Sequence, residues 1–96
     1  MKISELIEEL QEAEKNGINR VKIGNTYIDK VTCEGVGCYI DLIVSNTYGL
    51  NLSELIKVLH SMRVGYGIDV EVKCMEYKIL YTDAIVDTCY IKYKHG

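Results

Sequence analysis

One short pattern occurs twice in this chain and limits the folds open to it. The chain begins MKISELIEEL, and NLSELIKVL follows from residue 51, so that Ser-Glu-Leu-Ile recurs within similar surroundings. In both copies the apolar side chains return every three to four residues, which is the spacing of one face of an α-helix. The pattern predicts a helix over residues 4–15, and a second helix that starts near Leu52 and ends at the segment GYG. Ser4 is the candidate N-cap of the first helix, and Asn51 or Ser53 that of the second.

Three strand-like segments follow each predicted helix. In the first half they are NRVKI, TYIDKVTC and CYIDLIVS, and the two longer ones are joined by EGVG, a hairpin signal. In the second half they are IDVEVKC, YKILYT and AIVDTCYIKYK. A shift of 49 residues places Ser4 on Ser53 and Val21 on Val70, and two further residues of shift place Tyr39 on Tyr90.

The predicted fold is therefore α+β and consists of two αβββ repeats, residues 1–48 and 49–96, within a single domain over residues 1–96. Two helices pack against an antiparallel sheet, or against two smaller sheets. One αβββ unit exposes the apolar face of its sheet, whereas two units can share a core. Chance similarity between two amphipathic helices is the alternative explanation.

The charge pattern excludes some classes of partner. The net charge is −3; residues 1–48 hold eight acids and five bases, and residues 49–96 hold six of each. No basic stripe suited to a phosphate backbone is present, so we expect no direct binding of nucleic acid.

No apolar run reaches the ~18 residues of a membrane span, and the N-terminus lacks the features of a signal peptide. The expected location is the cytoplasm of a host cell.

The cysteines and histidines do not predict an enzyme. Cys33 and Cys38 flank the EGVG segment, and a metal or redox role for this pair is left open. Cys74 and Cys89 are expected to be small buried strand residues. No catalytic motif accompanies the two histidines, and no metal or other cofactor is predicted.

Two groups of side chains are candidates for binding a protein. The first is a glutamate stripe opposite the apolar face of the first helix, spaced i, i+3, i+4 and i+7: Glu5, Glu8, Glu9 and Glu12. Its alternative reading is an ordinary solvated helix face. The second group is drawn from eight tyrosines in a chain without Phe or Trp: Tyr39, Tyr90 and Tyr93. Tyrosine is common among the anchors of interfaces, but these rings could also simply cover the outer face of the sheet.

The opening KISELIEEL, followed by VKIG and YIDKV, resembles small proteins encoded by phages and prophages of Gram-positive bacteria. The order of helix, three strands and helix is also similar to that of an anti-CRISPR inhibitor of Cas9. Here, however, no dense acidic cluster follows the third strand. The resemblance implies a phage protein that evades host defence by inhibiting a host protein.

The predicted function is thus a non-enzymatic protein-binding module, a phage-encoded inhibitor whose partner is a host protein with a basic surface. A homodimer is left open. The first alternative is a small-ligand protein that binds a nucleotide signal, with tyrosines stacked on the base and with phosphate held by basic residues drawn from Arg20, Lys22, Arg63 and Lys73. The second alternative is a homo-oligomeric structural component of a phage particle.

Overall fold

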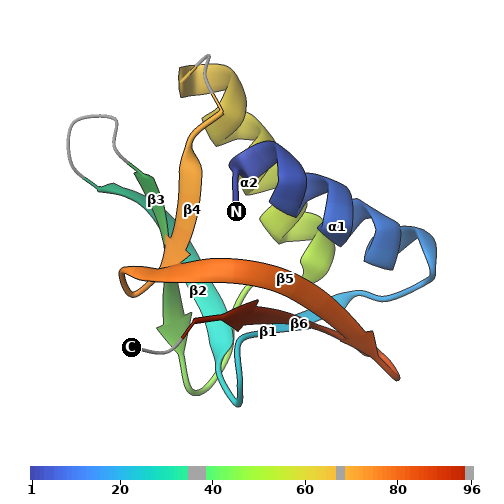
Figure 1. Cartoon of the computed structure of the whole chain (residues 1–96). Coiled ribbons are helices and arrows are strands. Elements are labelled where there is room, and N and C mark those ends of the chain that lie inside the picture. The colour runs from blue at the N-terminus through green and yellow to red at the C-terminus, as the bar shows by residue number, and fades with distance from the viewer. Residues whose placement is uncertain (35–38, 67–68, 95–96) are drawn as a thin grey trace.

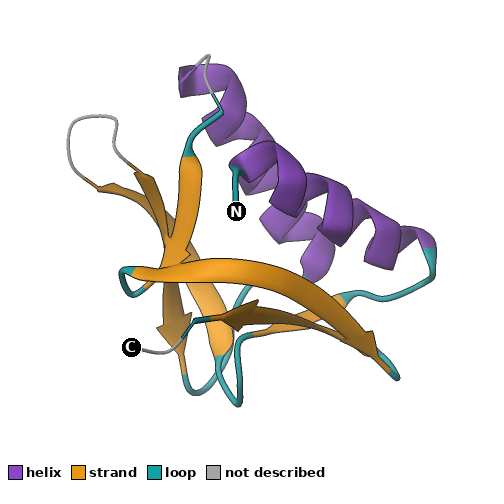
Figure 2. Ribbon diagram, viewed as in Figure 1, coloured by secondary structure: helices purple, strands orange, loops and turns teal. Residues whose placement is uncertain are grey.

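Figure 1 shows a computed structural model of the chain, which describes residues 1–34, 39–66 and 69–94. Within these ranges, two helices lie on one side of a strongly bent six-stranded sheet (Figure 2). The predicted α+β class is confirmed. In chain order the elements are α1 (Ile3–Lys15), β1 (Arg20–Lys22), β2 (Tyr27–Glu34), β3 (Tyr39–Ser45), α2 (Leu52–Tyr66), β4 (Glu71–Cys74), β5 (Tyr77–Ile85) and β6 (Thr88–Tyr93).

Helix α1 forms where the apolar spacing predicted it, but its N-terminus differs from the prediction. The helix begins at Ile3, and the Glu5 carboxylate accepts the Lys2 N–H at 2.8 Å. Ser4 is therefore not the N-cap; it lies in the first turn. There its N–H and its hydroxyl both donate to the carboxylate of Asp69, a residue distant in sequence. A side chain from a distant segment thus accepts a hydrogen bond from an N–H group of the first turn, a role that a local N-cap residue usually has.

Helix α2 starts after one of its two predicted caps, Asn51. The Asn51 side chain accepts the Glu54 N–H at 2.8 Å, and the Glu54 carboxylate accepts the Asn51 N–H at 2.9 Å. This reciprocal capping box satisfies two N–H groups that would otherwise be unpaired. The Leu52 N–H donates to the Asn19 carbonyl at 2.9 Å, which ties the start of α2 to the segment before β1.

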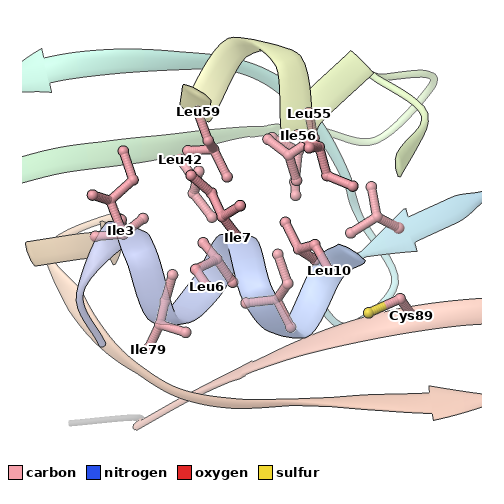
Figure 3. Packing of buried hydrophobic residues seen from close by; sticks show 14 of the residues in the cluster. Ile3, Leu6, Ile7, Leu10, Leu42, Leu55, Ile56, Leu59, Ile79 and Cys89 are labelled. Carbon is pink, nitrogen blue, oxygen red and sulfur yellow. The ribbon is translucent and has the colours of Figure 1, made fainter. Parts of the chain in front are cut away.

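A single aliphatic core lies between the helices and the sheet (Figure 3). Burial of each such side chain stabilises the fold by roughly 1.5–3 kcal/mol. Its fully buried members come from both halves of the chain, and the largest of them include Leu6, Leu10, Ile40, Leu42, Leu55, Leu59, Ile79 and Ile91.

The sheet is mixed, which corrects the prediction of an antiparallel sheet. Its strand order is β1-β6-β5-β4-β3-β2. The pairs β1–β6 and β3–β4 are parallel, and the other three pairs are antiparallel. Helix α2 connects β3 to β4, and a helical crossover is the usual connection between parallel neighbours. Apolar alternation indicates that a strand exists but does not identify its partner.

The two parallel pairs join the two halves of the chain. The first strand of each half pairs with the last strand of the other half. Lys22 lies opposite Tyr90 in one pair, and Glu71 lies opposite Tyr39 in the other. These are the positions that the sequence alignment of the halves makes equivalent. The repeat itself stays a prediction, because similar pairing does not establish a common origin.

The boundary between the last two strands differs from the prediction, and one predicted turn falls outside the described residues. The sequence predicted a single strand over AIVDTCYIKYK, whereas β5 extends to Ile85 and a two-residue turn separates it from Thr88. Val86 in that turn has a φ of 56°, a left-handed conformation that β-branched residues rarely adopt, so no turn signal marked it. Of the EGVG segment, residues 35–37 are outside the described ranges, and so is Cys38.

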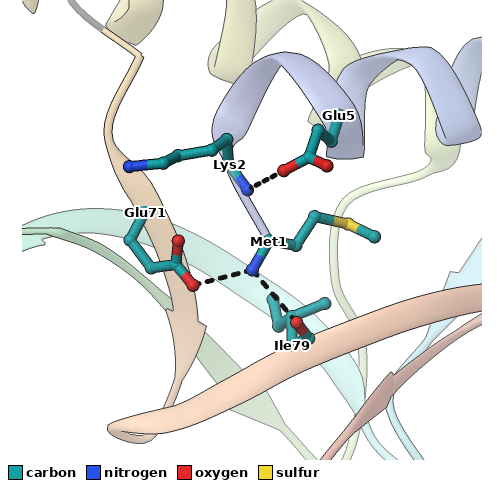
Figure 4. A network of polar contacts seen from close by, with 5 residues as sticks. All are labelled: Met1, Lys2, Glu5, Glu71 and Ile79. Carbon is teal, nitrogen blue, oxygen red and sulfur yellow. Dashed lines mark hydrogen bonds and ion pairs between the residues drawn. The ribbon is translucent and has the colours of Figure 1, made fainter.

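The N-terminal residue closes a gap in the sheet (Figure 4). Strands β4 and β5 pair only near their shared turn and then diverge. Met1 lies between them: its carbonyl accepts the Val72 N–H at 2.9 Å, and its ammonium donates to the Ile79 carbonyl at 3.1 Å. The same ammonium forms an ion pair of 2.7 Å with Glu71. Met1 therefore links the two arms of the bent sheet.

Candidate functional site

Two residues of the glutamate stripe on α1, Glu9 and Glu5, accept hydrogen bonds within the molecule. Glu9 is half-buried, and its Oε1 accepts both the N–H and the hydroxyl of Thr82, each at 2.8 Å. Glu5 is used at the start of the helix, as described above. Glu8 and Glu12 are exposed. The acidic side of α1 is thus attached to β5 through Glu9, and its other three carboxylates are exposed.

Strand β5 and the turn after it carry an exposed apolar surface that was not predicted from the sequence. Three large apolar side chains of β5 and one in the turn after it are exposed, namely Leu80 (47%), Tyr81 (49%), Ile85 (47%) and Val86 (93%). We call these four residues the β5 apolar surface. The turn after β5 projects away from the helices at the lower right of Figure 1. The four side chains lie within seven consecutive residues. Apolar exposure that forms one patch is typical of interaction sites. Sequence alone gave no sign of it, because an apolar strand reads as core.

The three predicted tyrosine anchors are not brought together. Tyr39 on β3 is half-buried, with the Lys73 Nζ 4.5 Å from its ring centroid. Tyr90 on β6 is also half-buried and has Lys92 at 5.3 Å; two strands separate it from β3. Tyr93 packs against the core, and its ring lies 5.6 Å from that of Tyr77. Each ring therefore has contacts within the molecule.

The cysteines have different environments. Cys33 is exposed, whereas Cys74 and Cys89 are buried as predicted. Burial, and after it the charge of Asp41, raises the pKa of Cys74 to about 11, and burial also raises the pKa of Cys89. Both thiols stay protonated at neutral pH. A role for Cys33 with Cys38 is untested, because Cys38 is outside the described residues. Across the part of the chain that the structure describes, no group of three His, Cys, Asp or Glu is placed to hold a metal ion.

A pocket of about 330 Å³ lies between β1, β2 and the loop that connects β3 to α2. Its polar lining residues are Asn19, Arg20, Tyr27, Thr47, Tyr48 and Asn51. Arg20 and Tyr48 are both exposed, and Tyr27 is half-buried. The pocket therefore combines a cation with two phenol rings.

The loop of this pocket is held close to β2. The Leu50 N–H donates to the Ile28 carbonyl at 2.8 Å. A Cβ atom at Gly49 would overlap that carbonyl and lie 2.8 Å from the Cβ of Tyr27. Only glycine allows such a close approach of two backbones without displacement. The pocket wall is thus fixed by packing and hydrogen bonding of the main chain.

Two of the four basic residues predicted as phosphate ligands lie at this pocket or beside it. Arg20 lines it, and the Lys22 Nζ lies 4.7 Å from the ring centroid of Tyr27, another lining residue. Arg63 belongs to α2, and Lys73 belongs to β4, where it contacts Tyr39.

No match was found when the chain was compared with protein-family models, with curated proteins and with solved structures. Among the described residues, no helix combines the length and the apolar character needed to cross a bilayer.

Proposed function

We propose that this chain is a non-enzymatic protein-binding module that binds through the β5 apolar surface and the adjacent exposed carboxylates of α1. The observation that carries the proposal is the grouping of four exposed apolar side chains on one strand and its turn. Val86 is the most exposed of them and has a positive φ. Strained residues persist where the surroundings hold them, and they are frequent at functional sites.

The exposed carboxylates of α1 indicate the charge of the partner. Because Glu9 binds Thr82, the acidic side of α1 lies beside β5. Glu8 and Glu12 add two exposed negative charges on the same helix. A partner with an apolar contact site flanked by basic residues would complement this arrangement. Charges at the rim of an interface mainly raise the association rate and make it sensitive to salt.

The resemblance of the N-terminal segment to phage proteins supports a host protein as the partner, and inhibition of host defence as the role. We therefore choose a lysate of a Gram-positive bacterium as the first source of partners. Bound proteins are captured on the tagged chain and identified by mass spectrometry, and the affinity of a stoichiometric partner is then measured with purified components.

Paired variants test whether the proposed surface carries the binding. Val86→Asp should weaken the affinity roughly tenfold or more, as expected for a buried interface anchor. Val64→Asp is its control, because Val64 is 80% exposed but belongs to α2. Equal binding by these two variants would overturn the proposal.

The acidic side of α1 is tested with Glu8→Lys/Glu12→Lys, and Glu14→Lys is the control on the same helix. The first variant should bind more slowly and lose the salt dependence of the association rate, whereas the control should retain most of both. Glu9 is kept, since its reversal would also remove the contacts with Thr82. A salt dependence unchanged in Glu8→Lys/Glu12→Lys would exclude these carboxylates from the interface.

A further inference from the structure

We propose that the pocket between β1, β2 and the β3–α2 loop binds a mononucleotide, with Arg20 at the phosphate and Tyr48 at the base. The pocket involves neither α1 nor β5, so this site is independent of the protein-binding surface. Four features of the pocket favour this ligand: its cations, its aromatic rings, its size and the rigidity of its wall.

The cations are placed on one side of β1. Arg20 and Lys22 flank Val21, which is buried in the core with 2% exposure. Because side chains alternate along a strand, both cations point to the side opposite Val21. Neither forms an ion pair with any residue that the structure describes. The guanidinium fork of Arg20 matches the geometry of a phosphate, and Lys22 can add a second charge from beside Tyr27.

The rings supply surfaces for a base. Tyr48 lines the pocket with 69% of its surface exposed, and Tyr27 also lines the pocket. Base stacking on tyrosine tolerates any nucleobase, because every base has a π-face. The amide groups of Asn19 and Asn51 and the hydroxyl of Thr47 are available for the ribose or the base edge. Asn51 already accepts the Glu54 N–H, so its NH₂ group is the part left to donate.

The size and rigidity of the pocket favour a ligand no larger than a mononucleotide. A volume of about 330 Å³ lies at the lower end of the range for small-molecule sites, about 300–1,000 Å³. The wall is preformed, since Gly49 and Leu50 are fixed against Ile28. A preformed site avoids the entropy cost of ordering a loop on binding.

The start of α2 borders the pocket but does not supply the phosphate site. Its Leu52 N–H is bonded to the Asn19 carbonyl, and its Glu54 N–H is bonded to Asn51. The Glu54 carboxylate also lies at this helix terminus and would repel a phosphate. Arg20 is therefore the group that should discriminate nucleotides from nucleosides.

The test is calorimetric titration of the full chain with AMP, GMP, CMP and UMP, and with adenosine and inorganic phosphate as partial ligands. We expect at least one nucleotide to bind roughly tenfold or more tightly than adenosine. A gain in affinity of this size is usual for one hydrogen bond to a charged group. Phosphate alone should bind more weakly than that nucleotide. In amide NMR spectra, shifts caused by the nucleotide should group at residues 19–22, 27 and 47–51.

Matched variants assign the two roles. Arg20→Gln should reduce nucleotide affinity roughly tenfold and leave adenosine affinity unchanged. Tyr48→Ala should weaken both ligands. The controls are Arg63→Gln and Tyr81→Ala, which alter an exposed arginine and an exposed tyrosine away from the pocket. Circular dichroism verifies that each variant is folded.

Four results would overturn the proposal. They are the absence of nucleotide binding at millimolar concentration, the failure of all four nucleotides to bind more tightly than adenosine, binding of phosphate alone as tight as that of the best nucleotide, and equal effects of Arg20→Gln and Arg63→Gln.

Discussion

At the scale of single residues, Asp69 links the start of α1 to the segment before β4. Its carboxylate accepts the hydroxyl and the N–H of Ser4. These two hydrogen bonds, the hydroxyl first, hold the pKa of Asp69 below its ordinary value of 3.8, and the nearby charges of Arg63 and Lys2 act in the same direction. The carboxylate is exposed, so solvent weakens these interactions.

A lowered pKa predicts how this contact depends on pH. Because the folded-state pKa is below the unfolded-state value, the stabilisation is complete above the unfolded pKa and is lost as the pH falls through the folded one. Ser4→Ala should therefore lower the free energy of unfolding more at pH 7 than at about pH 3. Urea titrations at the two pH values measure this difference.

The control for this prediction is the same substitution made in an Asp69→Asn background. In that background the effect of Ser4→Ala on the free energy of unfolding should be independent of pH. The effect that remains there includes the higher helix propensity of alanine, so the comparison separates this propensity from the contact with Asp69. A cost of Ser4→Ala that is equal at both pH values in the wild-type background would contradict the prediction.

At the scale of elements, the turn between β4 and β5 is formed by unusual residues. Met75 and Glu76 have φ values of 50° and 71°, and Cys74 pairs with Tyr77 across them. A two-residue hairpin with two positive φ angles is of type I′, for which Asn-Gly is the preferred sequence. The Glu76 N–H points to the buried carboxylate of Asp41 at 3.5 Å, which gives the turn a long contact to β3.

Replacing this turn with its preferred residues should stabilise the protein. We expect Met75→Asn/Glu76→Gly to raise the free energy of unfolding by about 1 kcal/mol, because it relieves the left-handed conformation at both positions. The backbone N–H that faces Asp41 is retained. Urea unfolding measures the change, and Met75→Ala/Glu76→Ala is the control, which should give no gain. A loss of stability in the Asn-Gly variant would show that the native side chains contribute more than their conformation costs.

The elements also show which parts of the fold could be predicted. Both helices could be, since their apolar spacing is a local property that survives in the structure, as the burial of Leu6 and Leu55 shows. The end of β5 could not, because Val86 carries no turn signal. Strand pairing could not either, since the parallel contacts of β1 and β4 depend on the whole chain.

The candidate sites follow the same division. Sequence identified Arg20 and Lys22 as possible phosphate ligands from their chemistry. The pocket beside them arises where the loop at Gly49 touches β2, a contact that no local pattern encodes. The glutamate stripe was visible from its spacing, whereas the use of Glu9 by Thr82 results from the packing of α1 on β5.

At the scale of the whole molecule, neither half of the chain has a complete set of partners. Strand β1 forms its ladder with β6, and β4 pairs with β3, so both parallel ladders cross between the halves. Helix α1 packs against α2, and the core draws residues from both. A separated half would therefore expose much of its apolar surface. Chains of about 50 residues have little surplus stability with which to tolerate this.

We expect fragments 1–48 and 49–96 each to be unfolded as monomers, and an equimolar mixture of them to regain a cooperative thermal transition, with the intact chain as the reference. Circular dichroism follows the helices, and analytical ultracentrifugation gives the masses. A monomeric fragment that unfolds cooperatively would contradict this expectation.

If fragment 1–48 instead folds as a homodimer, β3 of the second copy would take the place of β6. Tyr39 of β3 and Tyr90 of β6 are equivalent positions in the sequence alignment of the two halves. A homodimer in which β3 replaces β6 would therefore support the predicted repeat.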